Sequence, residues 1–345
     1  MDNIDFIFSA PGKAILHGEH AVVHGKVALA VSLNLRTYLR LKSNSTGKVS
    51  LCLPNIHTFM SWDVSSLLPL RPSTAADPKD MCELDAVLVQ RLHHFTGFPS
   101  EMPDTCAMAV LAFLYIYISV FAESRWSKEE LELINSWAFQ GERVIHGTPS
   151  GVDNAVGTWG GILRYHAGTI TPLSRVPVLR ILLTNTKVPR STKSLVAGVR
   201  DKIKKFPSVM HPVLESISAV SVTCELTLEE IASDPMPEHY AVLEELIDIN
   251  QHHLQVLGVG HASLDTLCRT TLAHGLHSKL TGAGGGGCGI TLLRPDADCS
   301  VVQNVIQELK DCGYDCWETS IGVPGVCLHS ASSLTEEVAQ ALNSN

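Results

Sequence analysis

The chain has 345 residues, which is about two domains at the usual domain size. Hydrophobic residues make up 45% of it, enough for a substantial core, which excludes a mainly disordered chain. The formal net charge of −9 at pH 7 argues against nonspecific binding to nucleic acid, because such binding requires a basic surface.

The first part of the chain shows the alternation of apolar and polar residues that is typical of strands. We predict a short strand at 4–8 and a longer, half-exposed strand at 29–41. The pattern returns at 49–53, so we expect these last two segments to pair across a turn at 43–47. Residues 71–80 are rich in Pro, Asp and Ala, which predicts a loop. One face of the longer strand would carry Leu29, Val31, Leu33, Leu35, Leu39 and Leu41.

Two helices are predicted next. The uncharged run at 106–122 has the minimum length of a membrane span. A buried core helix is favoured, because Ser119 interrupts the run and no second span exists. A capping box of Ser127 and Glu130 begins an amphipathic helix at 126–146. Its apolar positions, at helical spacing, are Leu131, Ile134, Ala138 and Ile145.

The second half of the chain has mostly helical patterns with strands before and after them. The predicted elements are a strand at 180–184, a helical region at 191–275 broken near Pro207, Pro212, Pro235 and Pro237, a strand at 289–293, a helix at 301–310 and a strand at 315–320. Strands thus dominate early and return late. This order predicts an α+β protein with two domains, at 1–175 and 176–345.

The first segment that could carry chemistry is SAPGK at 9–13, followed by HGEHAVVHG at 17–25. Lys13 is predicted to project from the end of a strand, as a point charge that suits a phosphate or a developing alkoxide. For Pro-Gly-Lys alone, a solvated turn lysine is the simpler interpretation. His20 and His24 have i,i+4 spacing, but no HExxH motif occurs, so a metal site at these histidines is disfavoured.

The second segment, GERVIHGTPSGVDNAVGTWGG at 141–161, contains two candidate carboxylates. Glu142 lies four residues beyond Ala138, on the predicted buried side of its helix, where an unpaired charge is costly. Its partner is either Mg²⁺, held together with phosphate oxygens, or a base such as Arg143. Asp153 lies in a glycine-flanked stretch, as either a helix N-cap or a general base that a substrate hydroxyl can approach.

The third segment, KLTGAGGGGCG at 279–289, has glycine at six of the eight positions from 282 to 289. Glycine loses the most conformational entropy on folding, so the run fits a place where backbone passes close to a ligand or to another loop. Successive amides could form an anion-binding nest, and a flexible linker is the alternative. The spacing matches neither the P-loop nor the dinucleotide-binding motif.

Ten cysteines are scattered along the chain, and none forms a C-x-x-C pair. Zinc sites and disulfide frameworks use tighter, paired spacing. The first residues also have neither a basic start nor the apolar core of a signal peptide. We therefore expect reduced thiols in a cytoplasmic protein.

The three segments, in this order, resemble the GHMP family of small-molecule kinases. So do TNTKVPRSTKSLVAGVR at 184–200 and EELIDINQHHLQVLGVGHASLD at 244–265, and the resemblance spans nearly the whole chain. It implies a two-domain GHMP-kinase-like fold. It also implies phosphorylation of the primary hydroxyl of mevalonate by ATP with Mg²⁺, in isoprenoid and sterol synthesis, by a cytosolic homodimer.

The resemblance also assigns roles to single residues. Asp153 is similar to the family's base, which takes the hydroxyl proton. Lys13 is similar to the cation beside it, which lowers the pKa of that hydroxyl and contacts ATP. Glu142 matches the Mg²⁺ ligand.

Three binding residues follow from the same resemblance. His20 and Arg190 match substrate contacts, and Arg190 is suited to a bidentate pair with a carboxylate. Asn55, in the stretch LPNI, matches a nucleotide contact.

One family motif has no counterpart in the chain. It is a loop similar to PPGAGLGSSAA, whose amides cradle the ATP phosphates at a helix N-terminus and whose serine binds Mg²⁺. In the expected place, VFAESR at 120–125 runs straight into Trp126. We therefore expect the N-terminal domain to lack a strand, this loop and a helix. Turnover should be strongly reduced and the apolar face at 106–122 uncovered.

Two alternatives stay open. The chain could be a noncatalytic variant that binds mevalonate or a full-length partner. A related sugar or homoserine kinase is disfavoured, because 17–25 and 187–190 match those enzymes less well.

Overall fold

A computed structural model describes residues 5–70, 86–98, 105–119, 128–146 and 149–343. The chain divides into two compact units, each built from segments that are distant in sequence. Unit 1 comprises Met1–Phe8, Tyr38–Thr158 and Leu328–Asn345. Unit 2 comprises Ser9–Thr37 and Trp159–Cys327. The domain division at residue 175 follows chain order and stays a prediction.

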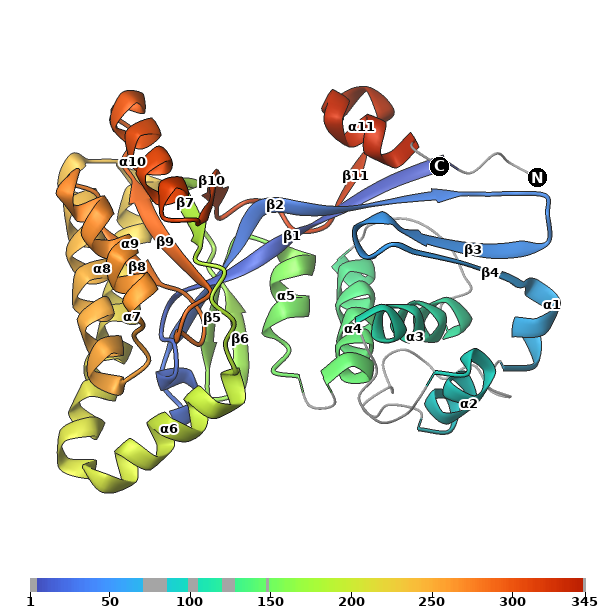
Figure 1. The fold of residues 1–345 in the computed structure, drawn as a ribbon, viewed down its shortest axis with the longest axis horizontal. Helices are drawn as coiled ribbons and strands as arrows, with labels where there is room; N and C mark the ends of the chain where they lie inside the picture. Colours follow the sequence, from blue (N-terminus) through green and yellow to red (C-terminus); the bar gives the residue numbers. More distant parts are fainter. Residues whose placement is uncertain (1–4, 71–85, 99–104, 120–127, 147–148, 344–345) are drawn as a thin grey trace. The chain divides into compact units, whose positions relative to one another are not determined.

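Helices and strands both contribute, which confirms the predicted α+β class; Figure 1 labels them. The strands are β1 (Asp5–His17), β2 (Ala28–Lys42), β3 (Lys48–Leu53), β4 (Thr58–Asp63), β5 (Ile162–His166), β6 (Thr169–Pro172), β7 (Leu179–Asn185), β8 (Ser278–Leu280), β9 (Cys288–Leu293), β10 (Asp315–Ile321) and β11 (Cys327–His329). The helices are α1 (Val64–Leu67), α2 (Ala86–Thr96), α3 (Thr105–Ser119), α4 (Lys128–His146), α5 (Val152–Trp159), α6 (Thr192–Lys205), α7 (Pro207–Ser233), α8 (Pro237–Leu257), α9 (Ala262–Ala273), α10 (Cys299–Asp311) and α11 (Glu336–Asn343).

The main sheet of the described chain has the strand order β11-β1-β2-β10-β7-β9-β8, with β5 paired to β2 and β6 to β5. Strand β7, the predicted strand at 180–184, pairs antiparallel with β10 on one side and β9 on the other. It therefore lies inside the sheet, where both faces of a strand can be covered.

Unit 2 places helices on both faces of this sheet. Ile181 and Leu183 of β7 pack in one cluster with residues of α7 and α8. The residue between them, Leu182, packs in another cluster with residues of α10. Successive side chains of a strand point to opposite faces, so a continuous apolar run is what a strand between two helical layers requires.

Unit 1 is organised around α3, the predicted core helix. Its residues Val110, Leu114 and Tyr115 are fully buried, and they pack with apolar side chains of α2, α4 and β3. No helix within the described ranges is both long enough and apolar enough to cross a membrane. The expected uncovered face is wrong for 105–117, where no large apolar side chain is exposed, because the neighbouring elements of unit 1 surround the helix.

The strand pairing predicted near the N-terminus is wrong. Strand β3 pairs with β4, in a separate two-stranded sheet, rather than with β2. In β2, Leu29 and Val31 are buried as expected, but Leu39 and Leu41 are exposed. Alternation decides which residues share a face of a strand, whereas neighbouring elements decide whether that face is covered.

The helical region at 191–275 contains α6 to α9, and one of the breaks predicted in it, near Pro212, is wrong. Pro207 and Pro237 begin α7 and α8, as expected for proline in a first helical turn. Pro212 lies inside α7 and does not end it. The buried face of that helix, which includes Met210 and Leu214, offsets the loss of one backbone hydrogen bond. The loop predicted at 71–80 lies outside the described residues.

Candidate active site

Lys13 lies within β1, not at the end of a short strand. The strand runs from Asp5 to His17 and passes through the SAPGK segment without a turn, which corrects the expected strand at 4–8. Lys13 is half-buried in unit 2. Its side chain is therefore held by a strand of the main sheet, which is a more rigid support than a turn.

Glu19, two residues beyond the end of β1, forms an ion pair with Lys279. Both side chains have zero exposure. Asn250 donates to the second carboxylate oxygen of Glu19 at 3.0 Å. The Lys279 ammonium also donates to the carbonyl of Leu280 at 2.7 Å. Burial raises the pKa of Glu19, and the adjoining Lys279 charge opposes that rise.

His20 joins the first motif to the third. It is 6% exposed, has a positive φ of 60°, and its Nε2 donates to the carbonyl oxygen of Ala283 at 2.8 Å. Burial lowers the pKa of His20, and its bond to that carbonyl opposes the decrease. The ring is therefore predominantly neutral at pH 7, with one nitrogen already bonded within the protein.

The glycine run packs against another loop of the same chain. Gly284, Gly285, Gly286 and Gly287 all have positive φ, at 73°, 66°, 120° and 67°. A Cβ on Gly286 would lie 2.6 Å from Val188. These positions therefore require glycine both for backbone conformation and for space, and the flexible-linker alternative is wrong.

Two amides of the run are already used within the protein. Gly285 donates to the carbonyl of Val259 at 2.8 Å, and Gly287 donates to that of Val188 at 3.1 Å. An anion nest needs amides that point at the anion, so these two cannot contribute to one without rearrangement.

Arg190 is exposed and lies against the same run. A Cβ on Gly287 would coincide with its guanidinium. Thr186, earlier in the same loop, donates from its hydroxyl to the Gly287 carbonyl at 2.8 Å. Unit 2 therefore brings His20 and Arg190, two predicted substrate contacts, to the glycine run.

Glu142 belongs to unit 1, on α4. The helix buries Trp137 in the apolar cluster around α3, with Leu133 and Val144 beside it, rather than the predicted face of Ile134 and Ala138. Glu142 is half-buried as a result. Its neighbour Arg143 lies over the ring of Phe139, 6.0 Å from the centroid. The predicted start of this helix at 126–127 lies outside the described residues.

Asp153 and Asn55 also belong to unit 1. Asp153 is exposed and is the second residue of α5, which excludes the N-cap alternative. A carboxylate in a first helical turn is stabilised by the positive end of the helix dipole. Asn55 is exposed in the short 3₁₀ turn Pro54–Ile56 that joins β3 to β4.

Glu142 is a candidate ligand for Mg²⁺. In the described part of the chain, no three His, Cys, Asp or Glu side chains gather closely enough to hold a metal ion. Mg²⁺ is usually held by one or two carboxylates plus substrate phosphates. Glu142 provides one such carboxylate.

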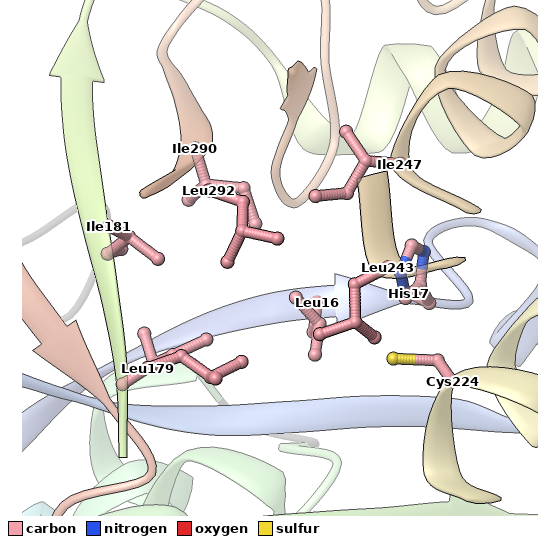
Figure 2. Close-up of a pocket in the computed structure, with 10 residues that line it drawn as sticks. Leu16, His17, Leu179, Ile181, Cys224, Leu243, Ile247, Ile290 and Leu292 are labelled. Carbon is pink, nitrogen blue, oxygen red and sulfur yellow. The ribbon is translucent and has the colours of Figure 1, made fainter. Parts of the chain in front are cut away.

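Figure 2 shows a small cavity in the core of unit 2. Its volume of about 10 Å³ is room for one water at most. Its lining consists of Leu16, His17, Leu179, Ile181, Cys224, Leu243, Ile247, Ile290, Leu292 and Ile321. The cavity is therefore a packing gap in the core rather than a substrate pocket.

Sequence reasoning missed the buried pair of Glu19 and Lys279, the hydroxyl of Thr281, which bonds to the backbone of Ile15 on β1, and Asn250. Glu19, Lys279 and Thr281 lie inside the motif segments, between residues that were singled out. The sequence Ser-Lys-Leu of β8 gave no sign that Lys279 is buried, and only its burial shows that the ammonium requires a carboxylate partner.

Comparisons with known proteins agree on a family. A family model described as GHMP kinases C terminal matches residues 230–315. Mevalonate kinases from Bos taurus and Homo sapiens are 54% and 53% identical to this chain, over 98% of each chain. The crystal structure of L. major mevalonate kinase in complex with R-mevalonate has a TM-score of 0.65 at 20% identity, covering 92% of this chain and 96% of that one.

The alignment to the bovine protein also shows a shortfall in length. It extends over 390 positions, whereas 98% of the 345 residues is about 338, so about 50 positions have no residue of this chain opposite them. Identity above one half from end to end is nevertheless decisive for ancestry: this chain belongs to the mevalonate kinase family of the GHMP kinases.

Proposed function

We propose that this chain has the activity of its family, the transfer of the γ-phosphoryl group of ATP to the primary hydroxyl of mevalonate, at a strongly reduced rate. The observation that carries the proposal is the 54% identity to the bovine mevalonate kinase over nearly the whole of both chains. The products are ADP, the phosphate ester and a proton.

Three residues carry the chemical step in this proposal. Asp153 accepts the proton of the primary hydroxyl from its exposed position in the first turn of α5. Lys13 lowers the pKa of that hydroxyl and stabilises the charge that develops during transfer. Glu142 would hold Mg²⁺, which neutralises charge on the phosphate oxygens when bound.

Three further residues bind in this proposal. Arg190 pairs with the carboxylate of mevalonate, for which a guanidinium has the matching two-point geometry. His20 contacts the substrate through its other ring nitrogen, Nδ1, because Nε2 is bonded to Ala283. Asn55 contacts the nucleotide. The family resemblance supports a homodimer that acts in isoprenoid and sterol synthesis, and the scattered thiols support a cytoplasmic location.

The reduced rate follows from the missing phosphate loop. Helices α3 and α4 are separated by residues 120–127, which are too few for a strand, a glycine-rich loop and a further helix. The length shortfall of about 50 positions against the bovine protein is consistent with such a loss. Removing one preorganised donor costs ~10²–10³ in rate, and this loop would supply several.

A noncatalytic role is the second candidate. His20 and Arg190, the proposed substrate contacts, both lie against the glycine run of unit 2, whereas the loop that would hold the ATP phosphates has no counterpart. A chain of this kind would bind mevalonate, or pair with a full-length partner, without transferring phosphate.

Two measurements test these proposals. In a coupled assay of ADP release with the bovine enzyme as reference, we expect turnover that requires both ATP and mevalonate and is at least ~10²-fold slower. The Asp153→Asn variant should abolish it. Turnover at the bovine rate would contradict the reduced rate, and turnover unaffected by Asp153→Asn would contradict the role of Asp153.

Calorimetry with each substrate alone separates the two candidates. Binding of both mevalonate and ATP favours the slow kinase, and binding of mevalonate alone favours the noncatalytic role. If neither substrate binds to the folded chain, both proposals fail.

A further inference from the structure

Both main-chain groups of Ile15, on β1, bond to one side chain. The Ile15 amide donates to the hydroxyl oxygen of Thr281 at 3.0 Å, and the same hydroxyl donates to the Ile15 carbonyl at 2.8 Å. In a sheet, these two groups point to the same edge of the strand and are normally met by a neighbouring strand. Here β8, which ends just before Thr281, is not a neighbour of β1 in the sheet order. A single hydroxyl therefore takes the place of a strand.

Thr281 is itself held firmly. It is 7% exposed, and its amide donates to the carbonyl of Cys288 at 3.1 Å. The amide of the preceding residue, Leu280, donates to the side chain of Gln251 at 2.9 Å. One residue earlier, Lys279 forms the buried ion pair with Glu19. The hydroxyl thus has little freedom to move away from β1.

Lys13 lies two positions before this contact on β1. Lys13 and Ile15 are two positions apart on β1, so their side chains share a face of the strand, about 6.6 Å apart along it. A strand that is fixed at Ile15 holds the direction of the Lys13 side chain. Placement within about 0.5 Å is what electrostatic stabilisation of a transferring group requires.

We propose that Thr281 is a positioning residue for Lys13. The inference rests on the proposed function, in which Lys13 stabilises charge during phosphoryl transfer. Thr281, the first residue after β8, would then have a different role from the glycines that follow it. Those glycines allow close packing, whereas the threonine supplies a directed pair of hydrogen bonds to the strand that carries the lysine.

A matched pair of variants tests this assignment. Thr281→Val removes the hydroxyl at nearly constant volume, and Thr281→Ser keeps it. The lysines are converted to ¹³C-dimethyl lysines, which keep their charge, and the Lys13→Arg variant identifies the Lys13 resonance. We expect Thr281→Val to shift that resonance and to lower residual kcat about tenfold, with KM for mevalonate changed less than about threefold. Thr281→Ser should leave the Lys13 resonance unshifted and should keep kcat and KM within about twofold of the unsubstituted chain.

Several outcomes would overturn the assignment. They are an unchanged Lys13 resonance in Thr281→Val, equal effects of Val and Ser, or a loss of kcat matched by a loss of folded protein. If Thr281→Val does not fold, amide exchange of the unsubstituted chain decides the question. The Ile15 amide must then be protected, and exchange as fast as that of an unbonded amide refutes the proposal.

The proposed function can fail separately. If mevalonate and ATP produce no turnover and no change in the Lys13 resonance of the unsubstituted chain, the kinase proposal fails. The substrate-free resonance in the two Thr281 variants still decides whether the hydroxyl positions Lys13.

Discussion

Both units have cores of packed apolar side chains, and unit 2 adds a fully buried ion pair to its own. Unit 2 buries the ion pair of Glu19 and Lys279 and surrounds it with directed hydrogen bonds. The described core of unit 1 is a cluster of apolar side chains around α3, with Leu114 and Tyr115 at zero exposure. The ion pair depends on angles and partners, whereas the apolar packing of both units depends on buried area and volume.

This difference affects which segments the chain can lose and still fold. Apolar packing has no preferred direction and tolerates rearrangement if volume is roughly conserved. A buried charge that loses its partner has no such freedom, because desolvation leaves it costly in any arrangement. The expected missing motif falls between α3 and α4, both in unit 1. The buried ion pair of unit 2 joins the segments 17–25 and 279–289.

The largest effect is expected from breaking the ion pair on one side. Lys279→Met leaves the Glu19 carboxylate buried without its cation, and we expect a loss of ~3–5 kcal/mol in the free energy of unfolding. The double variant Glu19→Gln with Lys279→Met removes both charges and should recover most of that loss. Urea denaturation measures all three chains. A loss below ~1 kcal/mol in the single variant would show that the pair is not desolvated.

A cavity in the core of unit 1 should cost somewhat less. Leu114→Ala deletes buried methyl groups from α3 and should destabilise the chain by ~2–5 kcal/mol. Leu114→Met nearly conserves volume and should cost less than ~1.5 kcal/mol. Thermal unfolding followed by tryptophan fluorescence suits this test, because Trp137 packs in the same cluster. Equal stability of the two variants would refute a packed core around α3.

A methyl group in the glycine run should affect binding more than stability. Gly287→Ala adds the strain of a left-handed alanine, ~1–2 kcal/mol, and displaces the guanidinium of Arg190. Gly275 has a similar φ of 72° and open space around its Cβ position, so Gly275→Ala isolates the strain. Calorimetry should show weaker mevalonate binding, by about tenfold, in Gly287→Ala only. The same affinity in both variants would argue against Arg190 as a substrate contact.

The smallest effect concerns pH. Burial, and then the charge of Lys279, hold the pKa of His17 well below its ordinary value of 6.5. In the unfolded chain His17 takes up a proton as pH falls below about 6.5, whereas in the folded chain it stays neutral. The unfolded state therefore binds more protons, and stability decreases at lower pH, by up to ~1.4 kcal/mol per unit from this residue.

Urea denaturation at pH 7.5, 6.5 and 5.5 measures that decrease. His17→Gln removes the titrating group and should flatten the profile below pH 6.5, whatever its effect on stability at pH 7.5. An identical slope in both chains would show that His17 does not contribute.

Much of the element order is determined by the sequence alone. The apolar run at 180–184, the helix at 301–310 and the strand at 315–320 all occur close to where they were predicted. Each depends on a periodicity that is complete within a few residues, so no distant partner is needed to recognise it. The glycine run at 282–289 is also visible in the sequence, but its left-handed conformation and close packing at 284–287 were decided by the structure.

Partners were decided by the tertiary structure. Strand β3 pairs with β4 rather than β2, and Leu39 is exposed although its pattern matched that of a buried residue. Glu19 meets Lys279 across 260 positions of sequence, and Thr281 reaches Ile15 across 266. Local periodicity predicts which residues of a strand or helix face the core. Which distant residues they contact there depends on the free energy of the whole packed arrangement. For that reason the motif residues were visible in the sequence, whereas the side chains that hold them in place were not.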